Sequence, residues 1–246
     1  MQAANFWNKL ALYRNKIVFL ALLLYLLPLA SHAQRYNTWA RAHNPAYDLR
    51  KISYGFSIGV HSSAYQVKYT DQFVDSKFDT LHSVMAPWSQ GLSLGFLVNL
   101  RLNEFLDLRL MPKGSFYDHK LEYNYTDRTR VDQLIETVLV EFPVLLKYKS
   151  MRRGNVRMYM VGGFTPGFDF SGKDDASASA VIDIKHTNLT MDAGLGFDFY
   201  FPLFKYSQEI RFSRGLPNML GADPSIYKEP LKKLNTNTIS VYFIFQ

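Results

Sequence analysis

Large apolar residues alternate with small or polar residues along residues 52–60, which read ISYGFSIGV. Successive side chains of a β-strand point to opposite faces, so this segment predicts a strand with one apolar face and one small, polar face. The apolar face must contact either a second sheet, as in a soluble sandwich, or the lipid around a membrane barrel. Which of the two it contacts decides the class of protein.

Seven further segments show the same alternation. In one of them Leu106, Leu108 and Leu110 alternate with Asp107 and Arg109. Several segments exceed the five or six residues usual in soluble sheets, whereas roughly 9–11 residues suit a strand that crosses a bilayer at a tilt. The seven segments are residues 88–100, 104–116, 136–148, 155–168, 187–201, 206–215 and 236–246.

The connections between these segments alternate in length. Short connections (RLN, KSMRRG and PLFK) follow the second, fourth and sixth segments, and the other connections are longer and polar. Short turns at one end and long loops at the other are typical of outer-membrane barrels. We therefore predict an all-β fold, an eight-stranded antiparallel up-and-down transmembrane β-barrel over residues 52–246, whose apolar face contacts outer-membrane lipid. The alternative is a periplasmic β-sandwich, which would be recovered without detergent.

The N-terminus has the features of a secretory signal peptide. Three bases precede an apolar run at residues 17–29, and small residues precede the expected cleavage point. A membrane-anchoring helix is the alternative, but the run is shorter than the roughly 20 residues that a span needs. We predict a signal peptide over residues 1–33, cleaved after Ala33, followed by a periplasmic N-terminal segment at residues 34–51 and localisation to the outer membrane.

Charge and composition exclude several kinds of partner and site. The formal net charge is +7, of which the three signal-peptide bases account for three, and no cluster of Lys and Arg has the density of a nucleic-acid site. The chain has no cysteine, so a disulfide, a zinc–thiolate site and a thiol nucleophile are all ruled out. We expect no nucleic-acid partner, no metal and no cofactor.

Many of the residues that alternate with the apolar face are charged. The interior of an eight-stranded barrel is filled by side chains, and charges there must pair to offset the loss of water. We predict a salt-bridge plug, with Lys113 and Tyr159 also facing inward; a proton or ion path is the alternative, and the diameter excludes folded cargo. The predicted charge network consists of Asp107, Arg109, Glu141, Lys147, Arg157, Asp192, Asp198, Glu209 and Arg211.

Two patterns suggest catalysis, and neither is in a suitable context. GLSLG at residues 91–95 matches the G-x-S-x-G nucleophile elbow, but that motif works on a strand-to-helix turn and this one lies within an alternating strand. His61 beside Ser62 or Ser63 is the best local pair for an outer-membrane hydrolase, with Ser93 as the other candidate nucleophile. We expect no catalytic residue and no small-molecule substrate, and keep the hydrolase as an alternative.

Three blocks of sequence resemble the PorT/SprT family of Bacteroidetes outer-membrane proteins. They are residues 100–123, 140–163 and 194–220, and the third, with FDFYF, FKYS and GLPN, is the most specific. The resemblance implies a role in type IX secretion, and in gliding motility where the organism glides, with other secretion components as partners. It implies no enzyme activity and no cofactor, and it supplies no catalytic motif. A structural or adhesive barrel of the OmpA type is the alternative function.

Partner contacts are expected at the ends of the barrel. The connection KSMRRG carries Lys149, Arg152 and Arg153 and is a candidate contact for an acidic partner if the N-terminus is periplasmic; the alternative is an ordinary solvated turn. In the N-terminal segment, Trp39 and Tyr47 are candidates for packing on a partner or at the membrane interface.

Overall fold

The computed structural model describes residues 43–70, 81–127, 130–170, 184–221 and 229–246. These residues belong to a unit that begins at Ala40, and a second unit, residues 1–39, lies outside the described residues. The predicted signal peptide, its cleavage point and Trp39 therefore lie outside them too. Within the described ranges, no helix is long and apolar enough to cross a bilayer.

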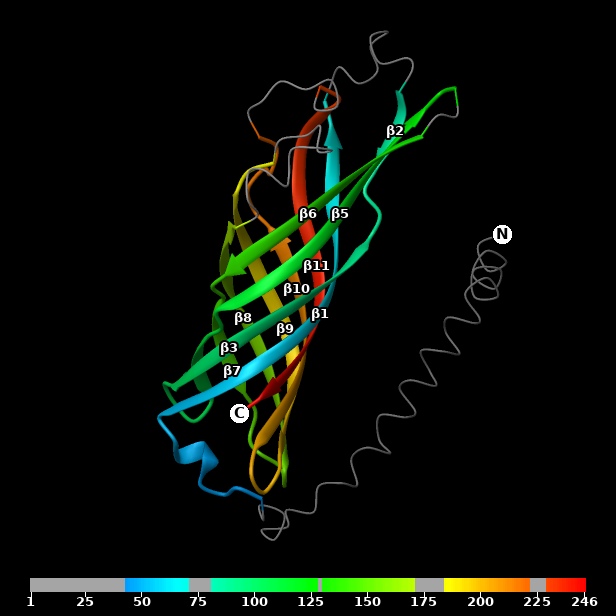
Figure 1. Cartoon of the computed structure of the whole chain (residues 1–246). Helices are drawn as coiled ribbons and strands as arrows, with labels where there is room; N and C mark the ends of the chain where they lie inside the picture. Colours follow the sequence, from blue (N-terminus) through cyan, green and yellow to red (C-terminus); the bar gives the residue numbers. More distant parts are fainter. Residues whose placement is uncertain (1–42, 71–80, 128–129, 171–183, 222–228) are drawn as a thin grey trace, which may run out of the picture. The chain divides into compact units, whose positions relative to one another are not determined.

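The strands form a closed antiparallel ring, because β1 pairs on one side with β3 and on the other with β11 (Figure 1). Around the ring β1 is followed by β3, the collinear pair β4 and β5, the collinear pair β6 and β7, and then β8 to β11. The prediction of an eight-stranded antiparallel barrel is confirmed. The strands are β1 (Ile52–Tyr69), β2 (Leu81–Met85), β3 (Ser89–Arg101), β4 (Leu106–Leu110), β5 (Lys113–Tyr125), β6 (Arg130–Glu141), β7 (Val144–Lys149), β8 (Val156–Asp169), β9 (Thr187–Tyr200), β10 (Lys205–Gly215) and β11 (Leu231–Phe245).

Prolines account for the interruptions between collinear strands. Pro112 separates β4 from β5 and Pro143 separates β6 from β7, and neither can donate a backbone hydrogen bond. Their carbonyls still accept bonds from the neighbouring strands, at 3.0 Å from Phe96 N and 3.1 Å from Met111 N. The register therefore continues across each break, and each pair acts as one strand of the barrel.

The alternation seen in the sequence sorts side chains between the outside and the inside of the ring. On β3, Leu94 and Phe96 point outward and are 58% and 73% exposed, whereas Ser93 between its apolar neighbours is buried. On β1, Phe56 is exposed and Ser57 is buried. A continuous apolar outer face of this kind is stable only against lipid, so the apolar face of residues 52–60 is the lipid-facing side of the barrel.

Aromatic side chains cluster on the outer face near the short turns. Phe245 stacks on Phe56 with ring centroids 5.0 Å apart and lies 5.2 Å from the ring of Tyr206, while Phe201 and Phe204 stack at 4.9 Å. Aromatic rings favour the boundary between hydrocarbon and headgroups. This cluster therefore marks the membrane boundary at the short-turn end, which faces the periplasm in outer-membrane barrels.

The pattern reverses at the opposite end of the barrel. There Tyr65, Leu121 and Tyr123 point inward and are buried, while charged residues such as Lys120 and Glu122 lie on the outside. A polar outer face cannot lie in hydrocarbon, so this part extends beyond the membrane. The inward residues form an apolar cap over the lumen, which consists of Tyr65, Val84, Leu121, Tyr123, Met219, Leu220, Leu231 and Leu234.

Candidate functional site

The interior of the barrel is filled by charged side chains. The structure places all nine sequence-predicted charges there, and none is more than 9% exposed. They occupy the inward positions of β4, β6, β7, β8, β9 and β10, because each alternates with a lipid-facing neighbour. The nine are Asp107, Arg109, Glu141, Lys147, Arg157, Asp192, Asp198, Glu209 and Arg211.

Glu209 is the centre of this network. Its carboxylate accepts hydrogen bonds from Arg109 Nη1 at 2.6 Å, from the Tyr159 hydroxyl at 2.9 Å and from Arg211 Nε at 3.0 Å. Two guanidinium groups thus share one carboxylate, and Arg211 also lies 4.0 Å from Asp192. Charge-assisted bonds across the lumen join β4, β8 and β10, and these buried side chains fill the lumen at this level.

Further ion pairs lie nearer the short turns. Lys147 Nζ is 2.7 Å from Asp198, which also accepts a bond from the Ser207 hydroxyl at 2.6 Å. Lys149 Nζ is 2.6 Å from Asp107. Both lysines are inward-facing residues of β7; Lys149 pairs with an acid of the neighbouring strand β4, and Lys147 reaches across β8 to an acid of β9.

Another pair lies toward the apolar cap. Lys113 Nζ is 2.7 Å from Glu141 and also donates to the Tyr242 hydroxyl at 2.7 Å. The Ser115 hydroxyl donates to the same carboxylate at 2.6 Å. Beside this pair is a cavity of about 20 Å³. This volume suffices for one or two water molecules. Its other walls carry Thr and Ser hydroxyls, Asn188, Asp192 and the side chains of Tyr117, His119 and Leu139.

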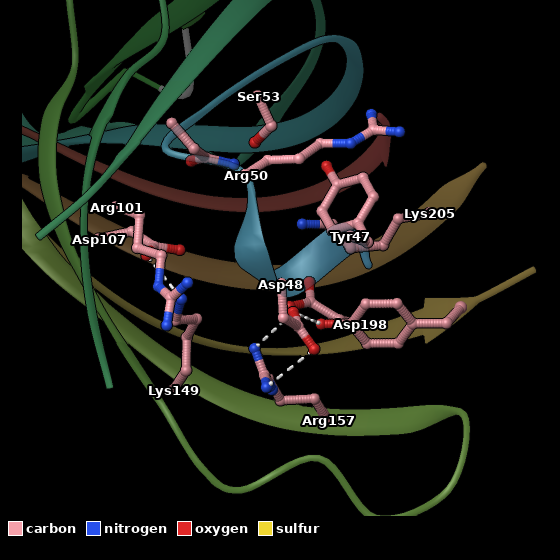
Figure 2. Close-up of a pocket in the computed structure, with 12 residues that line it drawn as sticks. Tyr47, Asp48, Arg50, Ser53, Arg101, Asp107, Lys149, Arg157, Asp198 and Lys205 are labelled. Carbon is pink, nitrogen blue, oxygen red and sulfur yellow. Dashed lines mark hydrogen bonds and ion pairs between the residues drawn. The ribbon is translucent and has the colours of Figure 1, made fainter. Parts of the chain in front are cut away.

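The short-turn end of the lumen is a cation-rich opening, here called the mouth, lined among others by Asp48, Arg101, Lys149, Arg157, Tyr200 and Lys205 (Figure 2). Residues 43–50, here called the strap, enter it through the 3-10 turn η3 (Tyr47–Leu49). Asp48 accepts two bonds from the Arg157 guanidinium, at 3.0 and 3.2 Å, and one from the Tyr200 hydroxyl at 2.9 Å. The strap is thus fixed by a bidentate ion pair.

The structure buries two of the three residues predicted to form a basic contact turn. Lys149 and Arg152 are each 5% exposed; Lys149 pairs with Asp107, and Arg152 donates to the backbone carbonyls of the strap. Gly154 allows the tight turn between β7 and β8, since its φ of 63° lies in the left-handed region that favours glycine. Of the three predicted contact residues only Arg153 is exposed while the strap is in place; contact with an acidic partner stays a prediction.

Tyr47 is also buried, at 6% exposure, so it does not stand free for a partner. Its ring meets Tyr200 edge-on at 5.9 Å, and Lys205 Nζ lies 4.5 Å from its centroid. Sequence reasoning missed Asp48 and Lys205 as members of the interior. Lys205 could have been found by extending the alternation of Ser207 and Glu209 by two residues, whereas the strap has no periodic pattern that would place Asp48.

The candidate hydrolase residues do not form a Ser–His pair in the described structure. Ser93 is 1% exposed, and its hydroxyl has no hydrogen-bond partner among the described residues. His61 Nε2 lies 3.2 Å from the Phe116 carbonyl, and its ring packs 4.3 Å from that of Tyr117. Nor, among the described residues, do three His, Asp or Glu side chains gather as metal ligands would.

Comparisons with known proteins place the chain among outer-membrane barrels. The family model described as "Outer membrane protein beta-barrel domain" matches residues 32–221. Neisserial surface protein A is 12% identical over 79% of this chain and 98% of its own, with a TM-score of 0.40. The outer membrane protein OprG of Pseudomonas aeruginosa is 10% identical over 80% and 94%, with a TM-score of 0.44. The outer membrane enzyme PagL is 8% identical over 76% and 97%, with a TM-score of 0.35. No curated protein sequence matches the chain.

Proposed function

Because the chain belongs to the outer membrane β-barrel domain family, and so lies in the outer membrane, we propose that it is a PorT-like protein required for export by the type IX secretion system. It acts through partners or through assembly of the system rather than as the conduit. Where the organism glides, the same requirement extends to gliding motility. An N-terminal signal peptide, cleaved after Ala33, would deliver it to the periplasm.

The closed lumen supports the proposal that the barrel does not itself conduct the cargo. Arg109, Glu209 and Arg211 are at most 1% exposed and fill the lumen, and the apolar cap closes the end away from the short turns. Opening a path for a polypeptide would leave these charges unpaired, which costs several kcal/mol for each ion. A barrel of this kind supports secretion through its ends and its outer face.

The secretion role itself is supported by the resemblance to PorT/SprT proteins. The most specific block, residues 194–220, covers the second half of β9, all of β10 and the short turn between them. This block also supplies Asp198, Lys205 and Glu209 to the interior. The resemblance therefore falls on residues that determine both the lipid-facing and the inward faces of the barrel.

A structural or adhesive role of the OmpA type is the second candidate. It is favoured by the β5–β6 hairpin, which extends with β2 at one end of the barrel (Figure 1), where the outer face is polar. Ion pairs brace its outer face: Lys120 lies 2.9 Å from Asp132, and Arg130 Nε lies 2.7 Å from the same carboxylate. A braced polar hairpin of this kind is suited to contacts outside the cell.

Deletion of the gene decides between the two. Type IX cargo is measured in the medium and in the cell, together with a periplasmic marker that reports leakage. Retention of cargo without leakage, reversed by re-expression of the wild type, supports the secretion role. Normal secretion by the deletion strain overturns it and leaves the structural or adhesive role.

A further inference from the structure

The mouth holds more bases than acids. Its charged lining consists of five bases and three acids. Two of the acids already have partners within the barrel, since Asp107 pairs with Lys149 and Asp198 with Lys147. Asp48 of the strap is therefore the carboxylate left to balance the remaining bases.

The remaining bases are poised for an anion. Arg157 is 9% exposed, and its Nε has no hydrogen-bond partner among the described residues although the group lines the mouth (Figure 2). Lys205 is 4% exposed, and none of the described carboxylates lies within 4.0 Å of its Nζ. Buried bases without a full set of acceptors favour the entry of negative charge.

The site recognises peptide as well as charge. Arg157 forms a fork on the Asp48 carboxylate, and Arg152 donates to the backbone carbonyls of His43 and Asn44, a few residues before it. A phosphate ion or a lipid headgroup offers the charge but not the row of backbone carbonyls. The contacts are those of a receptor for a carboxylate carried on a short turn of peptide.

We propose that the mouth is a binding site for an acidic peptide segment, which Asp48 occupies in cis and a periplasmic protein occupies in trans when the strap is displaced. The strap is suited to displacement, because only one short turn of it is regular and Leu49 within that turn is 73% exposed. The inference rests on the mouth alone, so it holds for a secretion role and for a structural role alike.

The test reports displacement of the strap in the full-length protein in detergent. The chain has no cysteine, so a spin label on Leu49→Cys reports the strap alone. Hexaglutamate is titrated at fixed ionic strength, with hexaglutamine and inorganic phosphate as comparison probes. We expect the mobile fraction of the label to rise saturably with hexaglutamate only.

Two variants and a matched control sharpen the test. Asp48→Asn removes the competing carboxylate, so the label becomes mobile without ligand. Isothermal titration calorimetry should then show hexaglutamate binding about tenfold or more tightly than to the parent. Adding Arg157→Gln to that variant abolishes binding, whereas Glu104→Gln, which removes an exposed acid from a neighbouring short turn, behaves as the parent. Circular dichroism verifies that each variant keeps its barrel.

Three results overturn the proposal. One is a label that hexaglutamate does not mobilise in the parent. Another is an unchanged hexaglutamate affinity in Asp48→Asn. The third is displacement by phosphate as effective as displacement by hexaglutamate, which would make the mouth a general anion site without peptide recognition.

Discussion

Replacement of Glu209 by glutamine tests whether the interior network stabilises the barrel. Glu209 is 0% exposed and is the acceptor for Arg109, Arg211 and the Tyr159 hydroxyl. Glutamine keeps the size and one acceptor oxygen but removes the charge. The guanidinium groups of Arg109 and Arg211 then lose the carboxylate to which both donate.

The expected cost follows from that geometry. Breaking a buried ion pair by removing one partner destabilises a protein by about 3–5 kcal/mol, because the other charge stays buried without compensation. Two bases lose their partner in Glu209→Gln, so we expect the upper part of that range. Arg211 retains Asp192 at 4.0 Å, which limits the loss.

The measurement is urea-induced unfolding of the purified barrel in lipid vesicles, followed by tryptophan fluorescence. The control is Glu136→Gln, an exposed carboxylate on the outside of β6, for which a change within about 0.5 kcal/mol is expected. A Glu209→Gln protein as stable as the Glu136→Gln protein would refute the reasoning. Replacing Arg109, Glu209 and Arg211 together by Met, Leu and Met should restore part of the stability, since only Asp192, which loses Arg211, is then left without a base.

Three further outcomes are expected. Leu121→Ala in the apolar cap should lower the unfolding free energy by about 2–5 kcal/mol in the same urea assay, because Leu121 is fully buried. Hydrogen bonds from Arg130 and then Lys120 lower the pKa of Asp132 below its usual 3.8. The ion pairs of Asp132 are therefore present above pH 3.8 and are lost as the pH falls through the lowered pKa. A spin label at the hairpin tip should gain mobility over that fall in pH, and Asp132→Asn should abolish the pH dependence. N-terminal sequencing of the mature protein should begin at Gln34, and a start at Met1 would contradict the predicted signal peptide.

The barrel could be predicted from the sequence because lipid imposes the same rule on every strand. Each strand that crosses hydrocarbon must present apolar residues on alternate positions, so the period-two pattern recurs and identifies both faces at once. The same alternation predicted which charges enter the lumen. Arg109, for example, is inward because Leu108 and Leu110 face lipid.

The parts that the sequence did not predict lie where that rule ends. The predicted first strand stops at Val60, but β1 continues to Tyr69. From His61 onward the strand leaves the lipid-facing band, and its apolar residues, such as Tyr65, turn inward instead of outward. The pattern therefore weakens although the strand persists. The strap could not be placed for a related reason: its position depends on Asp48 meeting Arg157, more than one hundred residues away, and not on any local periodicity.

The lumen is closed at three levels by three different kinds of interaction. Apolar packing closes the end beyond the membrane, ion pairs around Glu209 close the middle, and the strap occupies the mouth through Asp48. The first two are buried and costly to disrupt, whereas the third depends on a partly exposed carboxylate and a short turn. We therefore expect the strap to be the closure that is displaced most easily. Displacement of the strap would change the surface of the mouth without opening the lumen, as the proposed action through partners requires.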